Sequence, residues 1–147
     1  MSPAPAQPSE RRRLYIDTSA YLGMLLGEDE AEPLLVEARG AELLSSVLLL
    51  LETKRNLVRL AREGTLTPAQ YKTCLGRVDE DQRVFILRDL TLDLCTSNLV
   101  PAMATPRSLD LGHLRTALWF QAEDRLDRFV TLDRAQAEAA RELGLPV

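Results

Sequence analysis

The chain has 147 residues, of which 46% are hydrophobic and 27% charged, and its formal net charge is −4. This composition is typical of a globular protein with one hydrophobic core, and it excludes a fibrous or fully disordered chain. The longest apolar run, residues 47–51, is far shorter than the ~20 residues that cross a membrane. The first residues carry no apolar segment, so we expect no signal peptide, no membrane partner and a cytoplasmic location.

Apolar strands alternate with amphipathic helices along the chain. We expect a disordered tail over residues 1–11 and one domain over residues 12–147. Helices are predicted at residues 18–27, 28–40, 46–64, 67–81, 90–101, 108–125 and 133–144. Strands are predicted at residues 13–16, 41–45, 83–87 and 128–132, with residues 145–147 as an optional fifth strand.

This alternation predicts βαβ units and a parallel sheet, because parallel neighbours need a long crossover connection. Such crossovers are right-handed, so helices are expected on both faces of the sheet. The predicted fold is a three-layer α/β/α sandwich around a central parallel sheet of four to five strands. Ligands of such folds bind outside the carboxyl ends of the strands.

Four acidic residues stand at the start of predicted helices or near it. Asp17 and Asp133 follow strands, and each could simply cap the next helix. Asp110 lies in the first turn of a helix that we expect Ser108 to cap, where the helix dipole favours an acid. Position 111 is not Glu or Gln, so a capping box is not expected there.

The fourth acid, Glu52, lies two turns into the helix predicted at 46–64. It could be a surface residue paired with Arg55. The run "VLLLL" just before it is apolar nearly all round, however, and an acid beside a buried run needs a partner. The predicted core stripe of this helix avoids Glu52 and contains Val47, Leu50, Leu51, the stem of Lys54, Leu57, Val58 and Ala61.

A parallel sheet brings these four acids to the same edge. Carboxylates that lie close together repel one another, and without a cation some of them hold a proton. A hard divalent cation removes this conflict, and an oxygen-only ligand set suits Mg²⁺ or Mn²⁺. The sequence therefore predicts a metal site made from Asp17, Glu52, Asp110 and Asp133.

Other kinds of site find little support. His113 is the only histidine and there is no G-x-S-x-G, P-loop or G-x-G-x-x-G motif, while Cys74 and Cys95 form no C-x-x-C pair. We expect His113 to pack or to form hydrogen bonds, with orientation of Asp110 as the second option. Phosphatases of the haloacid dehalogenase type need an acid two residues after the nucleophile, and that position is Ser19.

Four stretches in this order resemble the PIN-domain family, and within it the VapC-type ribonuclease toxins. The stretches are "YIDTSAYL", "SSVLLLLETKRNL", "SLDLGHLRTALW" and "RFVTLDRAQAEAARELGLPV". The resemblance covers most of residues 13–147, although residues 64–105 carry no signature of the family. The four motif acids coincide with the acids that topology brings together.

The resemblance implies a Mg²⁺-dependent endoribonuclease, with Mn²⁺ able to substitute, that hydrolyses RNA phosphodiester bonds through a carboxylate-bound metal and water. It assigns the metal and catalytic roles to Asp17, Glu52, Asp110 and Asp133, and places Thr131 at the border of the site. It also implies a homodimer and a VapB-like antitoxin that inserts a basic side chain into the acidic pocket. The alternatives are a catalytically inactive PIN-like binding module and, further off, an aspartyl-phosphate enzyme.

The charge balance is compatible with an RNA substrate. The chain has 18 basic and 22 acidic residues, so it is neutral once the four site acids are set aside. Arg55, Arg59 and Arg62 form a row near Glu52 that could follow an RNA backbone, or could be an ordinary solvated helix face. Aromatic residues make up only 5% of the chain, so base stacking is not expected to dominate affinity.

Overall fold

The computed structural model describes residues 11–96 and 107–147. The strands are β1 (Arg13–Ile16), β2 (Glu42–Ser46), β3 (Ile86–Arg88) and β4 (Arg128–Val130). The helices are α1 (Thr18–Leu26), the 3₁₀ turn η2 (Asp29–Ala31), α2 (Glu32–Ala38), α3 (Leu48–Arg62), α4 (Pro68–Asp81), α5 (Leu92–Thr96), α6 (Ser108–Glu123) and α7 (Arg134–Glu142). Residues 1–10 of the tail predicted at 1–11 lie outside the described residues, as does the end of the helix predicted at 90–101.

The four strands form one parallel sheet in the order β3-β2-β1-β4. This confirms the predicted α/β fold and places β1 between β2 and β4. In the described residues, 145–147 do not form the optional fifth strand. Two backbone bonds hold that segment: the N–H of Leu145 donates to the Ala140 carbonyl over 3.0 Å, and the N–H of Phe129 donates to the Pro146 carbonyl over 2.6 Å.

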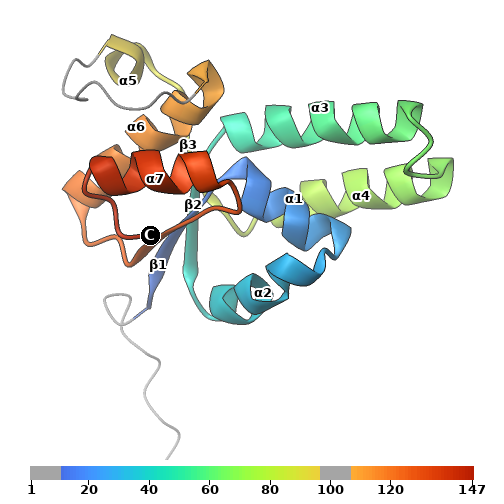
Figure 1. Cartoon of the computed structure of the whole chain (residues 1–147), viewed down its shortest axis with the longest axis horizontal. Coiled ribbons are helices and arrows are strands. Elements are labelled where there is room, and N and C mark those ends of the chain that lie inside the picture. Colours follow the sequence, from blue (N-terminus) through green and yellow to red (C-terminus); the bar gives the residue numbers. More distant parts are fainter. Residues whose placement is uncertain (1–10, 97–106) are drawn as a thin grey trace, which may run out of the picture.

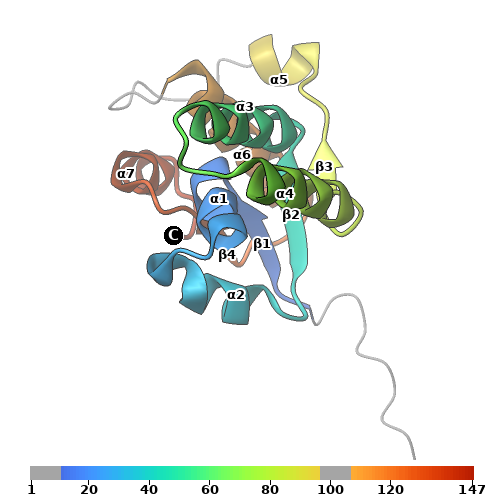
Figure 2. The same ribbon diagram turned by 90° about the vertical axis from the view of Figure 1, so that its right-hand side faces the viewer.

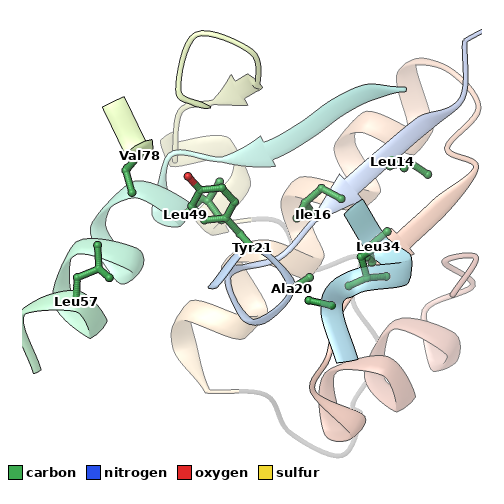
Figure 3. Close-up of a cluster of buried hydrophobic side chains, with 10 residues drawn as sticks. Leu14, Ile16, Ala20, Tyr21, Leu34, Leu49, Leu57 and Val78 are labelled. Carbon is green, nitrogen blue, oxygen red and sulfur yellow. The ribbon is translucent and has the colours of Figure 1, made fainter. Parts of the chain in front are cut away.

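Helices cover both faces of the sheet (Figure 1). Side chains of β1 alternate between the faces, because successive residues of a strand point in opposite directions. Leu14 and Ile16 pack with α1 to α4, and Figure 3 shows this cluster reaching Leu57 on α3. Tyr15 faces the other way and packs with α6, α7 and Phe129. The result is the expected three-layer arrangement.

Helices α3 and α4 lie side by side and extend away from the sheet, as both views show (Figures 1 and 2). The start of α4 follows from its sequence: the Thr67 hydroxyl accepts from the N–H of Gln70, and the Gln70 side chain accepts from the N–H of Thr67. Helix α1 ends at Gly27, whose φ of 70° lies in the left-handed region that glycine adopts without strain.

The predicted cap of α6 is wrong by one residue. Ser108 is already helical, and the extended residue Arg107 precedes the helix. Asp110 is therefore the third helical residue, and its carboxylate accepts a hydrogen bond from the N–H of Arg107 over 3.3 Å. An acid at this position stabilises the helix start through both the bond and the helix dipole.

The predicted core stripe of α3 is also wrong in its rotation. Leu51 is 68% exposed and Val58 is 44% exposed, although both were placed in the core. The run of apolar residues at the start of α3 offers an apolar side chain in every direction, so periodicity does not fix the rotation. The buried residues of α3 are Leu48, Leu49, Thr53 and Leu57.

Over residues 11–96 and 107–147, no helix is long and apolar enough to cross a lipid bilayer.

Candidate active site

A cavity of about 220 Å³ opens where the chain leaves the carboxyl ends of the parallel strands. Helices α1, α3, α6 and α7 each contribute to its wall or border it with a capping residue. All four acids singled out by the sequence line this one cavity. Its lining consists of Asp17, Thr18, Ser19, Leu22, Glu52, Asn56, Asp110, His113 and Asp133.

Asp17 lies directly after β1, and its backbone N–H donates to the Val130 carbonyl of β4 over 3.1 Å. Its side chain caps α1 by accepting from the N–H of Ala20 over 3.0 Å, so the capping role is confirmed. The same oxygen accepts from the Ser19 hydroxyl over 2.8 Å. The side chain is buried, and this burial raises the pKa of the Asp17 carboxyl above its usual range, although the hydroxyl and N–H donors oppose the shift.

A chain of hydroxyl contacts connects Asp17 to the start of α7. The Ser19 hydroxyl lies 3.1 Å from the Thr131 hydroxyl and accepts from the N–H of Leu132. The Thr131 hydroxyl in turn accepts from the N–H of Asp133 over 3.1 Å. Thr131 therefore lies at the border of the cavity and fixes the backbone on which Asp133 stands.

Glu52 enters the cavity from the second turn of α3, with 16% of its side chain exposed. Its Oε1 accepts from the Thr18 hydroxyl over 2.9 Å and lies 2.7 Å from Nε2 of His113. Arg59, one of the arginines near it in sequence, pairs with Glu63 instead. Glu52 is thus held toward the cavity by α1 and α6, and the expected surface pairing with Arg55 does not describe its contacts.

His113 is 1% exposed and joins three elements. Its Nδ1 lies 2.7 Å from the Tyr15 hydroxyl, and its Nε2 is within 3.0 Å of the Thr18 hydroxyl as well as close to Glu52. Among the described residues its side-chain bonds go to these three partners and not to Asp110. The hydrogen-bonding role is confirmed, and the option that His113 orients Asp110 is not supported by the contacts.

The remaining two acids, Asp110 and Asp133, stand at the starts of α6 and α7. Asp133 is exposed and caps α7 by accepting from the N–H groups of Ala135 and Gln136. Asp110 is half-buried, and its backbone carbonyl accepts from Nε2 of Gln136 over 3.0 Å. The Gln136 bond ties α6 to α7 and so fixes the separation of the two acids.

The chemistry of these groups fits a hard divalent cation. The cavity presents carboxylate, hydroxyl and amide oxygens, and none of the described residues that line it is Lys or Arg. Within residues 11–96 and 107–147, however, no three His, Cys, Asp or Glu side chains are grouped closely enough to hold a metal ion directly. Mg²⁺ keeps several waters and needs only one or two direct carboxylates, so the other acids of the cavity would act through water.

The arginine row lies on the exposed side of α3. Arg55, Arg59 and Arg62 line a surface hollow of about 440 Å³ together with Val58 and Glu63. The acidic cavity and this surface hollow both border helix α3, on which Glu52 precedes the arginines. Arg55 lies about one helical turn beyond Glu52, and Arg62 lies about three turns beyond it.

Several polar residues of the cavity were not predicted from the sequence. Thr18 and Ser19 follow Asp17 directly, and Asn56 follows Glu52 by one helical turn. Their position in sequence beside a candidate acid, or one helical turn from it, is the signal that could have identified all three. Nothing in the sequence marks Tyr15 as part of a site, because an aromatic residue in a strand is typical of the hydrophobic core.

In sequence, neither a protein-family model nor a curated protein matches this chain. The assignment of a function therefore depends on the chain's own residues and their geometry.

Proposed function

We propose that this protein is a Mg²⁺-dependent endoribonuclease of the PIN-domain type. The observation that carries the proposal is the single cavity lined by Asp17, Glu52, Asp110 and Asp133, which come from four separate parts of the chain. A structural role explains Asp17, Asp110 and Asp133 taken singly, since each also stabilises a helix start. It does not explain why all four face one cavity without a cationic side chain among its described lining residues.

The four acids have different roles in this proposal. Asp17 and Asp110 are the proposed direct ligands, while Glu52 and Asp133 bind through water or position the attacking water. When bound, Mg²⁺ would neutralise charge at the phosphate and make a nearby water more acidic. Thr18 and His113 keep the Glu52 carboxylate in place, and Ser19 does the same for Asp17.

The partners in this proposal follow from the charge pattern. Arg55, Arg59 and Arg62 contact the RNA backbone, which places a phosphodiester at the acidic cavity. The acidic cavity would equally accept a basic side chain of a VapB-like antitoxin, so the protein is proposed to be the toxin of such a pair and to act in the cytoplasm. A homodimer is part of the same proposal, and the exposed apolar side chains Leu51 and Val58 on α3 are available for it.

The test is cleavage of a mixed RNA pool with Mg²⁺ and with EDTA. We expect wild type to cleave only with Mg²⁺, and Asp17→Asn to lose at least ~100-fold of the rate. Asp79→Asn is the matched control, because it removes an exposed acid on α4 outside the cavity and should leave the rate unchanged. Equal cleavage by wild type and Asp17→Asn would contradict the proposal, and RNA binding without cleavage would favour the inactive binding module.

A further inference from the structure

A buried hydrogen-bonded chain leads from the centre of the sheet to the candidate site. The Tyr15 hydroxyl lies 2.7 Å from Nδ1 of His113, and Nε2 of the same ring lies 2.7 Å from Oε1 of Glu52. These three residues come from β1, α6 and α3. These hydrogen bonds therefore connect β1, an inner strand of the sheet, with a carboxylate of the cavity.

The packing around Tyr15 holds its side chain in one position. It is fully buried, stacks on Phe129 with ring centroids 5.3 Å apart, and meets the His113 ring edge-on at 5.8 Å. Packing alone would need only the ring, since Phe would fill nearly the same volume. A buried hydroxyl and imidazole are costly unless they are hydrogen-bonded, so the hydroxyl calls for a reason beyond packing.

The hydrogen bonds of His113 indicate which of its ring nitrogens carries a hydrogen. An ionised Glu52 only accepts, so Nε2 of His113 carries a hydrogen and donates to it. The Tyr15 hydroxyl lies 2.7 Å from Nδ1 and is placed to donate to it, and an Nδ1 that accepts leaves the ring hydrogen on Nε2.

The same geometry sets which Glu52 oxygen is available. The Thr18 hydroxyl and His113 Nε2 both bind Oε1. Within the described part of the chain, Oε2 has no hydrogen bond, which leaves it available to a ligand in the cavity. Two donors on one oxygen hold the carboxylate in a single orientation.

We propose that Tyr15 is a positioning residue of the site: its hydroxyl selects the Nε2–H form of His113, and His113 thereby fixes the Glu52 carboxylate with Oε2 toward the cavity. The link to a divalent cation rests on the proposed function, whereas the tautomer and the orientation do not. Residues that orient a metal-binding group in this way typically change metal affinity by 10–100-fold when they are removed.

The first measurement is the ¹⁵N NMR spectrum of the imidazole in metal-free protein. His113 is the only histidine, so every imidazole signal belongs to this residue. We expect wild type to show the ring hydrogen on Nε2 with Nδ1 as the acceptor, and Tyr15→Phe to show a mixture of the two tautomers. Tyr21→Phe is the matched control, because it removes a hydroxyl bonded to Asp81 in the other core cluster and should leave the spectrum unchanged.

The second measurement is Mg²⁺ affinity by titration calorimetry. We expect Tyr15→Phe to weaken binding about 10–100-fold and Tyr21→Phe to weaken it less than about 3-fold. His113→Gln, which keeps an N–H donor, should retain more affinity than His113→Leu. This pair provides a second reading if Tyr15→Phe proves too unstable to titrate.

The outcomes separate the two proposals. A wild-type ring with its hydrogen on Nδ1, or a spectrum that Tyr15→Phe leaves unchanged, would overturn the positioning role. Equal Mg²⁺ affinity in Tyr15→Phe and Tyr21→Phe would also overturn it. Absence of Mg²⁺ binding by wild type, with the expected tautomer changes intact, would overturn the proposed function and leave the role of Tyr15 in orienting Glu52 supported.

Discussion

Nε2 of His113 lies 2.7 Å from Oε1 of Glu52, although 61 residues separate them in the chain. The bond joins α6 to α3 across the edge of the sheet where the cavity opens. Hydrogen bonds to a charged group are stronger than those between neutral groups, and this one is largely shielded from water. It therefore serves both the stability of the fold and the geometry of the site.

Replacement of His113 by Leu should lower the free energy of unfolding by about 2–4 kcal/mol. The change leaves the Tyr15 hydroxyl and part of the Glu52 carboxylate without their partner, and an unpaired buried polar group costs about 1–3 kcal/mol. In the double variant with Tyr15→Phe the loss should be less than the sum of the two single losses, because both partners of one bond are then apolar. Urea denaturation measures all four proteins, and strictly additive losses would contradict the coupling.

Asp17→Asn should stabilise the metal-free protein at neutral pH. Burial raises the pKa of Asp17, so the folded state holds this proton more tightly than the unfolded state does. The carboxyl's contribution to stability is then fully present below its ordinary value of 3.8 and is lost as the pH rises through the raised folded value. The advantage of Asn should therefore be near zero at about pH 3.5 and grow to about 1 kcal/mol at pH 7.

Thermal or urea unfolding in EDTA across this pH range measures that difference. Asn keeps a side-chain oxygen for the N–H of Ala20, so the cap is retained. Added Mg²⁺ should stabilise wild type, by about 2.7 kcal/mol at 100 times the dissociation constant, and should have little effect on Asp17→Asn. A variant that is less stable than wild type at pH 7 in EDTA would contradict the buried-charge explanation.

Two glycines in helices should respond in opposite directions to Ala. A Cβ at Gly23 would lie 2.6 Å from a Leu132 methyl and 3.1 Å from the Ala31 Cβ, so the packing of α1 has to shift. We expect Gly23→Ala to cost about 1–2 kcal/mol. A Cβ at Gly76 in α4 meets nothing within 4 Å, so Gly76→Ala should stabilise by about 0.5–1 kcal/mol. Denaturant unfolding tests both, and a stabilising Gly23→Ala would show that α1 is less tightly packed than described.

Much of the fold could be predicted because local signals and topology agree. The alternation of apolar strands and helices was sufficient for a parallel sheet, and the end of α1 at Gly27 follows from the glycine itself. The gathering of Asp17 and Asp133 at one edge follows from topology, since parallel strands share an edge for their carboxyl ends. Their capping and their cavity position are compatible, because a helix start is also where such cavities form.

Other features depend on side-chain directions that one sequence does not fix. The apolar run before Glu52 allowed several rotations of α3, and the structure selects one that exposes Leu51. The hydrogen-bond partners of His113 could not be predicted from the sequence either. Its neighbour in sequence is Asp110, yet its ring meets Tyr15, which is 98 residues away.

The arginine row should contribute electrostatically to RNA affinity. In the Asp17→Asn background, the added pair Arg55→Ala and Arg62→Ala should weaken RNA binding about 5–50-fold at low salt. It should also reduce the slope of log affinity against log salt by about 1.4, since each phosphate contact to a single strand contributes ~0.7. The charge-matched control is Arg39→Ala with Arg83→Ala, both of which are exposed and outside α3. Fluorescence anisotropy measures binding, and equal losses in the two double variants would remove any special role of the row.

The central claim is that the acidic cavity binds a divalent cation through its carboxylates. The most direct measurement is anomalous diffraction from crystals soaked in Mn²⁺, for wild type and Asp17→Asn. We predict a manganese peak inside the cavity, in contact with Asp17 and Asp110 and with water between the ion and Glu52 or Asp133, and no peak in Asp17→Asn. A wild-type cavity that stays free of manganese, or a peak only at another place on the protein, would contradict the claim.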